Sequence, residues 1–254
     1  MSDSFGLGGR TAVVTGASRG LGRAMAEALA KAGAKVVLVA RDGDALAQAA
    51  AELTSQSCDV VVRQLDLSQV DALESWVEGV WSEVGPIEIV LHSAGHQRRA
   101  PAIEVDPRDW ERILTVNLTA PFFLSQALGR WQIEAGLGGS HIFIGSLTTS
   151  IGIANAASYA ASKAGLAGVV RTLAVEWASY GIRVNAIAPG YFRTALTEGN
   201  FQDSELNAWV HSRIPMGRLG VPDDLGGAAV FLASDASSYM TGAILGVDGG
   251  WLAG

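Results

Sequence analysis

Tyr159 and Lys163 stand four residues apart in the segment SYAASKAG, within a predicted helix over residues 156–180. Side chains at positions i and i+4 share one face of a helix, so the phenol and the ammonium are expected to lie together. A free tyrosine has a pKa of about 10, but a nearby positive charge stabilises its phenolate and lowers that pKa. The pair therefore suits proton transfer beside a carbonyl, although an ordinary helix with an exposed lysine has the same spacing.

The segment VTGASRGLG, residues 14–22, is compatible with more than one chemistry. Residues 16–20 fit the G-x-S-x-G turn that exposes the nucleophile of a serine hydrolase, which here is Ser18. The chain lacks an HGGG-type oxyanion segment, however, and His211 is the only histidine placed late enough to serve as the base of a triad. The hydrolase interpretation also leaves the last glycine of the segment without a role.

The same segment fits a phosphate-binding turn between a strand and a helix. Gly16 permits the tight turn, Gly20 lets a pyrophosphate approach the start of the helix, and Gly22 allows the helix to pack closely on the strand. A glycine turn that binds nothing is the third interpretation.

Two polar residues are predicted near these groups. Ser146 closes the predicted fifth strand, and Asn117 lies within the predicted long helix before it, where asparagine is unfavoured. Together with the glycine turn and the Tyr159/Lys163 pair they occur in this order on suitable elements, which is a far less probable coincidence than any one of them alone.

Short β-branched runs alternate with helical stretches along the chain, and these elements must position the polar groups. Strands are predicted at 11–15, 35–40, 60–65, 87–92, 140–146, 182–188 and 242–250, and helices at 20–32, 44–53, 70–84, from about 107, and at 156–180. This pattern favours the α/β class, with a doubly wound, Rossmann-type parallel sheet of about seven strands and helices on both faces. Ligands of such sheets bind beyond the carboxyl ends of the strands. We expect a single domain over residues 1–254, with a substrate lid at about 191–215.

Composition excludes several classes of function. The net charge of −7 argues against a nucleic-acid partner, which requires clustered Lys and Arg. No apolar run approaches the roughly 20 residues needed to cross a bilayer, and no signal pattern is present, so we expect a cytoplasmic protein without a membrane association. One cysteine and four scattered histidines predict neither a disulfide nor a metal site. A mean hydropathy of +0.26 favours association with other subunits.

With these motifs in order, the chain resembles the short-chain dehydrogenase/reductase family from GRTAVVTGASRGLG to GAILGVDGGW, which is essentially its whole length. The resemblance implies an enzyme that moves hydride between a nicotinamide and a substrate carbon. It implies that Ser146 hydrogen-bonds the substrate oxygen and that Tyr159 transfers the proton. Lys163 is expected to lower the tyrosine pKa and hold the nicotinamide ribose, and Asn117 to support a water-linked proton relay behind Lys163.

The resemblance also implies a dinucleotide site and a homotetramer built through the long helices after the fourth and fifth strands and through the carboxyl-terminal strand region. The expected cofactor-binding residues are Gly16, Ser18, Arg19, Gly20, Leu21, Gly22, Arg41, Asp66, Leu67, Ser93, Ala94, Gly95, Tyr159, Lys163, Pro189, Gly190 and Thr194. One departure is plain, because the family usually has Asn-Asn-Ala-Gly after the fourth strand and this chain has His92-Ser93-Ala94-Gly95. Ser93 can still form local hydrogen bonds.

Charge near the adenosine ribose predicts the cofactor. An acidic residue at the end of the second strand would repel a 2′-phosphate, but here Ala40 is followed by Arg41, and Arg19 lies in the glycine turn. Two guanidiniums favour NADP(H), with NAD(H) possible, unless Arg41 merely starts a solvated helix. Asp66 resembles the family's adenine-contacting acid, and its alternative role is to cap a helix beginning near Ser68.

The segments AGHQRRAP and APGYFRT and the carboxyl-terminal sequence look most like gluconate 5-dehydrogenases and 2-dehydro-3-deoxygluconate 5-dehydrogenases. Arg98 and Arg99 suit a sugar-acid carboxylate, and they can equally be surface charges or contacts to a neighbouring subunit. The expected substrate contacts are Arg98, Arg99, Ser146, Tyr159 and Tyr191. The prediction is an NADP-preferring enzyme that interconverts a secondary alcohol and a ketone, with gluconate and 5-ketogluconate as the leading pair. The alternatives are a reductase of a sulfo-sugar, acyl thioester or xenobiotic ketone, and a non-catalytic dinucleotide-binding protein.

Overall fold

The β-branched runs pair in parallel as one sheet in the order β3-β2-β1-β4-β5-β6-β7. The computed structural model describes residues 4–193 and 204–254. Its strands are β1 (Thr11–Thr15), β2 (Lys35–Ala40), β3 (Val60–Gln64), β4 (Ile89–His92), β5 (Gly139–Ile144), β6 (Ile182–Pro189) and β7 (Ile244–Val247). The chain order reverses between the adjacent strands β1 and β4, which opens a crevice beyond their carboxyl ends. The predicted doubly wound sheet is confirmed.

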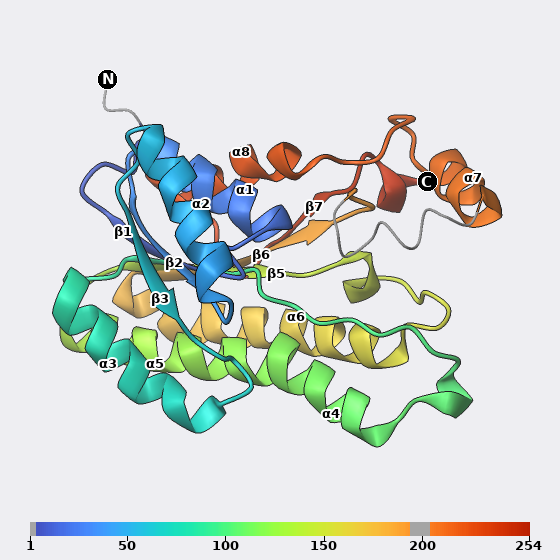
Figure 1. Ribbon diagram of the computed structural model, residues 1–254, viewed down its shortest axis with the longest axis horizontal. Helices are drawn as coiled ribbons and strands as arrows, with labels where there is room; N and C mark the ends of the chain where they lie inside the picture. The colour runs from blue at the N-terminus through green and yellow to red at the C-terminus, as the bar shows by residue number, and fades with distance from the viewer. Residues whose placement is uncertain (1–3, 194–203) are drawn as a thin grey trace.

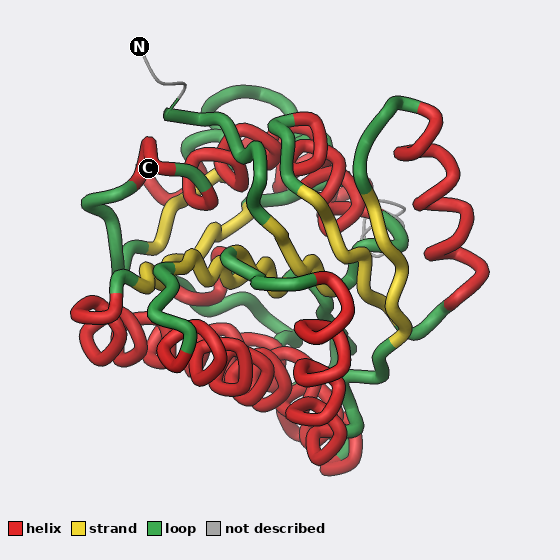
Figure 2. The backbone as a smooth tube through the Cα atoms, turned by 90° about the vertical axis from the view of Figure 1, so that its left-hand side faces the viewer, coloured by secondary structure: helices red, strands yellow, loops and turns green. Residues whose placement is uncertain are grey.

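Helices cover both faces of the sheet (Figures 1 and 2). One face carries α1 (Gly20–Lys31), α2 (Gly43–Ser55) and α8 (Gly226–Ala233), and the other carries α3 (Leu73–Val84), α4 (Pro107–Leu114), α5 (Ala120–Glu134) and α6 (Ala157–Trp177). The helix α7 (Ser204–Arg213) lies apart at one end of the molecule, close to the carboxyl terminus.

Alternation along the strands divides the apolar side chains between two cores. Val14 and Leu38 pack with residues of α1 and α8, whereas Val13 and Val37 pack with residues of α3 and α5. All four are fully buried. A strand with both faces covered must be apolar at successive positions, which is why these strands read as continuous runs of Val, Ile and Leu.

The long helix expected from about Pro107 is interrupted, which corrects the predicted setting of Asn117. The helix α4 ends at Leu114, residues Thr115–Thr119 form a π-helical turn, and α5 begins at Ala120. A π-helical turn inserts one extra residue and redirects the side chains around it. Asn117 lies in this turn and is 1% exposed.

Several predicted boundaries also shift. The strand β4 begins at Ile89, where pairing with Ala12 begins, rather than at Ile87, and β5 ends at Ile144, two residues before Ser146. Residues 194–203 of the predicted lid, including Thr194, lie outside the described residues. Within the described ranges, no helix combines the length and apolarity needed to cross a bilayer.

Candidate active site

The glycine turn lies at the carboxyl end of β1 and contacts the chain that follows β4. Gly16 has φ of 71°, and a Cβ there would lie 2.7 Å from the amide nitrogen of Ala94. A Cβ on Gly22 would lie 2.3 Å from the Gly16 carbonyl oxygen, so both positions exclude a side chain. Gly20, with φ of 60°, has no atom within 4 Å of where its Cβ would be. Its backbone is open at the start of α1, as a phosphate-binding turn requires.

The hydrolase interpretation finds no support in the geometry. Across residues 4–193 and 204–254, Ser18 forms no hydrogen bond with a histidine, and His211 lies on α7. The close approach of Gly22 to Gly16 gives the last glycine of the segment the role that the phosphate-turn interpretation predicts for it.

The ends of β2 and β3 place Arg41 near Asp66. The carboxylate of Asp66 accepts hydrogen bonds from the Ser68 amide (3.0 Å) and hydroxyl (2.8 Å). These bonds, led by the amide, lower the pKa of Asp66, and the charge of Arg41 adds a smaller effect. Asp66 therefore caps a turn, although the helical turn begins at Val70 and not near Ser68. Arg19 and Arg41 are both exposed at this edge of the sheet.

The segment after β4 borders the glycine turn. The Ala94 amide donates to Thr15 Oγ1 (3.3 Å), and Ser93 Oγ would lie 3.0 Å from a Cβ on Gly22. Ser93 thus adjoins the glycine turn where the family usually has asparagine. Gly95 lies beside Asn117, whose Oδ1 would be 3.7 Å from a Cβ on Gly95.

His92, which with Ser93 replaces the family's usual Asn-Asn, begins a buried hydrogen-bond chain that the sequence did not reveal. Gln132 donates to the Ile87 carbonyl (2.9 Å), which leaves its oxygen to accept from His141 Nε2 (2.9 Å). His141 Nδ1 then accepts from Ser125 Oγ (3.0 Å), which accepts from His92 Nε2 (2.7 Å). Burial lowers the pKa of His92 well below its usual value and that of His141 to about 3, so both imidazoles are neutral.

The turn after β5 and the first turns of α6 bring three predicted catalytic residues together. The Ser146 hydroxyl lies close enough to the Tyr159 phenol to act on its pKa as a hydrogen-bonding group. Lys163 lies 5.6 Å from the centroid of the Tyr159 ring, and its ammonium donates to the Ile144 carbonyl at 2.6 Å. Lys163 is only 4% exposed, so it is not the solvent-exposed lysine that an ordinary helix would carry at this position.

The pKa of Tyr159 departs from the expected direction. Burial raises it above its ordinary value of about 10, while the hydrogen bond with Ser146 and the positive charge of Arg99 lower it by less. Burial also lowers the pKa of Lys163 to about 8. In this arrangement the ammonium of Lys163 is bound to a backbone carbonyl, and the charge of Arg99 also acts on the phenol.

Asn117 connects the chain after β4 to α6. Its Oδ1 accepts from the His96 amide (2.7 Å), and its Nδ2 donates to the His96 carbonyl (2.9 Å) and to Ser162 Oγ (3.2 Å). Ser162 Oγ in turn donates to the Tyr159 carbonyl (2.7 Å). Ser162 is a site residue that sequence reasoning missed, although its position next to Lys163 was visible. These bonds fix the backbone beside Tyr159.

The structure separates the two adjacent arginines. Arg98 pairs with Asp109 of α4 at 2.7 Å, and its side chain is 65% exposed. The charge of Arg99 acts on Tyr159 and lowers its pKa, and the Arg99 Nε is buried without a hydrogen-bond partner. The loop is held there because the Ala100 amide donates to the Asn155 carbonyl (3.1 Å), four residues before Tyr159. Of the two arginines among the predicted substrate contacts, Arg99 is the one whose charge acts on the tyrosine.

The chain after β6 forms the remaining side of the site. Pro189 is buried at the end of that strand, and a Cβ on Gly190 would lie 2.6 Å from the Asp248 Cα. The ring of the half-buried Tyr191 packs against Trp251, with centroids 4.9 Å apart. Trp251 follows the DGG segment near the carboxyl terminus, and no sequence motif indicated a role for it.

Known proteins with this arrangement are numerous. Residues 16–252 match a family model described as enoyl-(acyl carrier protein) reductase. The chain is 38% identical to the gluconate 5-dehydrogenase of Gluconobacter oxydans, over 98% of this chain and 96% of that protein. It is 42% identical to the 2-dehydro-3-deoxy-D-gluconate 5-dehydrogenase of Pseudoalteromonas atlantica, over 99% of each chain.

A solved structure agrees with the fold as a whole. The gluconate 5-dehydrogenase of Burkholderia cenocepacia, in complex with NADP and tartrate, superposes with a TM-score of 0.96 at 36% identity, over 99% of this chain and 98% of that one. The sheet order, the glycine turn and the Ser146, Tyr159 and Lys163 cluster agree with the expected family. The chain belongs to the short-chain dehydrogenase/reductase family.

Proposed function

We propose that this protein is an NADP(H)-dependent oxidoreductase that interconverts a secondary alcohol and a ketone on a sugar acid, with gluconate and 5-ketogluconate as the leading pair. The observation that carries the substrate class is the position of Arg99. A buried guanidinium nitrogen without a partner, in a residue whose charge reaches the proton-transferring tyrosine, suits a substrate that brings a carboxylate. The relatives named above as dehydrogenases of gluconate and of 2-dehydro-3-deoxy-D-gluconate support the same class.

The residues around Tyr159 divide the chemistry between them. Ser146 and Tyr159 hold the substrate oxygen, and the Tyr159 phenol oxygen gives up or takes the proton as the carbonyl and hydroxyl interconvert. Lys163 contributes a positive charge on the same helix face. NADP, when bound, accepts or supplies the hydride at its nicotinamide ring.

The cofactor site fits a dinucleotide with a 2′-phosphate. Gly16, Gly20 and Gly22 form a turn with an open backbone at the start of α1, where a pyrophosphate is held. Arg41 lies beside Asp66 at the adenosine end, and the position before it is Ala40 rather than an acid. The Burkholderia cenocepacia enzyme, which is solved with NADP, supports this preference.

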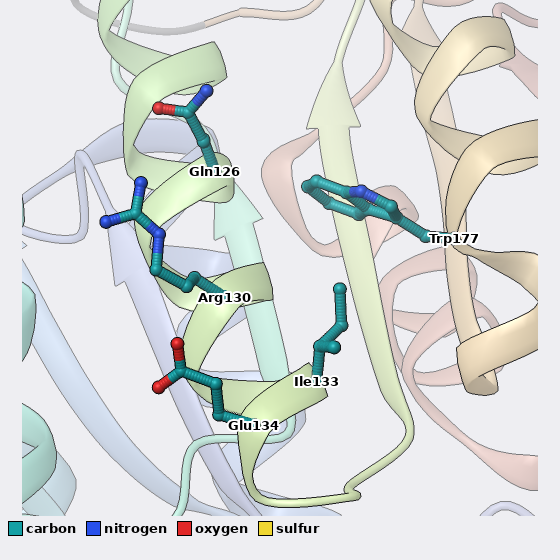
Figure 3. Close-up of a pocket in the computed structure, with 5 residues that line it drawn as sticks. All are labelled: Gln126, Arg130, Ile133, Glu134 and Trp177. Carbon is teal, nitrogen blue, oxygen red and sulfur yellow. The ribbon is translucent and has the colours of Figure 1, made fainter.

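A groove between α5 and α6 supports the proposed homotetramer. Figure 3 shows Gln126, Arg130, Ile133 and Glu134 of α5 on one side of it and Trp177 of α6 on the other. Trp177 is 18 residues after Tyr159, or about 27 Å along the helix, so this groove is separate from the active site. Exposed Phe123 and Val175 add apolar surface to the same two helices. We propose that a second copy covers this face. Light scattering on the purified protein measures whether copies of the chain associate in solution.

The localisation is a proposal as well. We place the enzyme in the cytoplasm, and the single cysteine of the chain, Cys58, is consistent with a reducing compartment.

The test of the proposed function is the near-ultraviolet absorbance of the nicotinamide after the protein is mixed with D-gluconate and NADP. Parallel reactions replace NADP by NAD, or gluconate by neutral polyols. Reduction of NADP that depends on gluconate, and that is lost in Tyr159→Phe, is the expected result. Turnover that survives unchanged in Tyr159→Phe contradicts the proton-transfer role. Turnover of neutral alcohols alone contradicts the sugar-acid assignment but keeps the reaction class.

A further inference from the structure

The carboxyl-terminal turn, residues 248–251, packs against α7 and beside the catalytic serine, and the chemistry proposed above does not use it (Figure 1). Trp251 is 2% exposed and lies in one apolar cluster with Leu147 and with Val210 and Ile214. Val210 belongs to α7, and Ile214 follows its last residue. Because Leu147 directly follows Ser146, the cluster joins the last turn of the chain to the active site.

Trp251 is the centre of the aromatic contacts in this region. Its ring lies 4.9 Å from that of Tyr191 and 5.4 Å from that of Trp209, which meets it edge-on at 75°. The guanidinium of Arg213 lies 5.5 Å from the Trp251 ring. One side chain therefore contacts both the segment after β6 and the exposed and buried sides of α7.

Backbone hydrogen bonds and two glycines fix the conformation of the turn that carries Trp251. The Asp248 carboxylate accepts hydrogen bonds from the amides of Gly250 (2.9 Å) and Leu252 (2.9 Å). Gly249 and Gly250 have φ of 65° and 91°, and a Cβ on Gly249 would lie 2.8 Å from Ile214 Cγ2. The two glycines thus allow the turn to approach the segment after α7, which a side chain would prevent.

We propose that Trp251 is a positioning residue for the substrate side of the site, acting through Tyr191 and α7 to set the affinity for the sugar-acid substrate. This inference rests on the proposed function for the identity of that substrate. Trp251 does not contact the glycine turn or the proposed adenosine end of the cofactor site. Replacing it should therefore change substrate binding without changing cofactor binding.

The kinetic test compares Trp251→Ala, Trp251→Phe and Leu252→Ala in the full-length enzyme. Losing two ring contacts and a cation–π contact should raise the KM for the alcohol about 10-fold or more, with kcat and the KM for NADP nearly unchanged. Trp251→Phe should restore most of the affinity, because it keeps the ring. Leu252→Ala is the matched control, since Leu252 directly follows Trp251, is 38% exposed and is outside the cluster.

Limited trypsin digestion tests the same contact without any substrate, so it gives an answer even where the substrate assignment fails. Trp251 stacks on Arg213, so cleavage after Arg213 should accelerate in Trp251→Ala and not in Leu252→Ala. Cleavage at the wild-type rate, or an equal rise of KM for alcohol and NADP, overturns the proposal. Should circular dichroism show Trp251→Ala unfolded, Trp209→Ala replaces it, with a smaller rise in the alcohol KM expected because only one ring contact is lost.

Discussion

Replacing Arg99 by glutamine should weaken sugar-acid turnover, whereas replacing Arg98 by glutamine should not. The two residues are adjacent in sequence and identical in type, so the pair forms an internal control. Arg99 has a buried, unpartnered Nε and a charge that acts on Tyr159, and Arg98 is paired with Asp109 at the surface. Glutamine keeps much of the side-chain length and some hydrogen-bonding capacity while it removes the charge.

The magnitude follows from the two environments. A hydrogen bond to a charged group contributes about 1.5–3 kcal/mol, which corresponds to a loss of about 10- to 150-fold in kcat/KM for gluconate in Arg99→Gln. An ion pair with a side chain that is 65% exposed is screened by water and contributes about 0–1 kcal/mol. Arg98→Gln should therefore stay within about 5-fold of the wild type.

The pH profile adds a second readout that a change in substrate binding alone would not produce. The charge of Arg99 lowers the pKa of Tyr159, so its removal raises that pKa. Alcohol oxidation needs the phenolate, and its rise with pH should therefore shift to higher pH in Arg99→Gln and stay in place in Arg98→Gln. Steady-state rates with gluconate and with a neutral polyol, over a range of pH, measure both effects. Equal effects of the two substitutions on gluconate turnover would refute the assignment of Arg99.

Three further substitutions test other parts of the structure. Lys163→Met should abolish activity yet stabilise the fold, because burial holds the folded-state pKa of Lys163 at about 8 against 10.5. At about 1.4 kcal/mol per pKa unit, burying the charged Lys163 destabilises the wild type by about 3 kcal/mol below pH 8. Lys163→Met should recover this free energy minus the contribution of the lost hydrogen bond to Ile144. The increase in the urea midpoint of the variant should shrink as pH rises toward 10.5, because the wild-type lysine is then neutral in both states. His141 stays neutral with a pKa of about 3 against 6.5, so this residue alone should cost the wild type up to about 1.4 kcal/mol of unfolding free energy per pH unit as pH falls below 6.5, in addition to the contribution of His92. His141→Gln should reduce that slope in urea titrations, with the contribution of His92 remaining, and the exposed His211→Gln should leave it unchanged. Arg41→Ser should raise the KM for NADP about 10-fold or more while it leaves that for NAD nearly constant, and equal effects on both would argue against a 2′-phosphate contact.

The sheet could be predicted from the sequence because strands buried on both faces must be apolar at successive positions. Val13, Val14, Leu38 and Val37 belong to such runs, and the helices between them leave only parallel pairing. The π-helical turn at Thr115–Thr119 could not be predicted, because the residues on either side continue a helical pattern. Its cause is tertiary, since Asn117 turns inward to bind the His96 backbone.

The candidate site was predictable where spacing alone fixes geometry. The four-residue interval from Tyr159 to Lys163 and the end of a strand before Ser146 needed no knowledge of distant contacts. The distinction between Arg98 and Arg99 depended on the Ala100–Asn155 hydrogen bond, which joins residues far apart in the chain. The direction of the Tyr159 pKa was mispredicted for a related reason, because the burial of the phenol outweighs the charges around it.

The distribution of charge explains how a chain with a net charge of −7 can hold an anionic cofactor and an anionic substrate. Arg19 and Arg41 are exposed at the edge of the sheet proposed to hold the adenosine end of the cofactor, and Arg99, whose charge acts on Tyr159, has a buried nitrogen. Field strength at a bound anion depends on the nearest charges and on the local dielectric far more than on the sum over a screened surface. Salt should therefore weaken the contacts of the exposed Arg41 more than those of Arg99, so the KM for NADP should rise with ionic strength more steeply than the KM for gluconate.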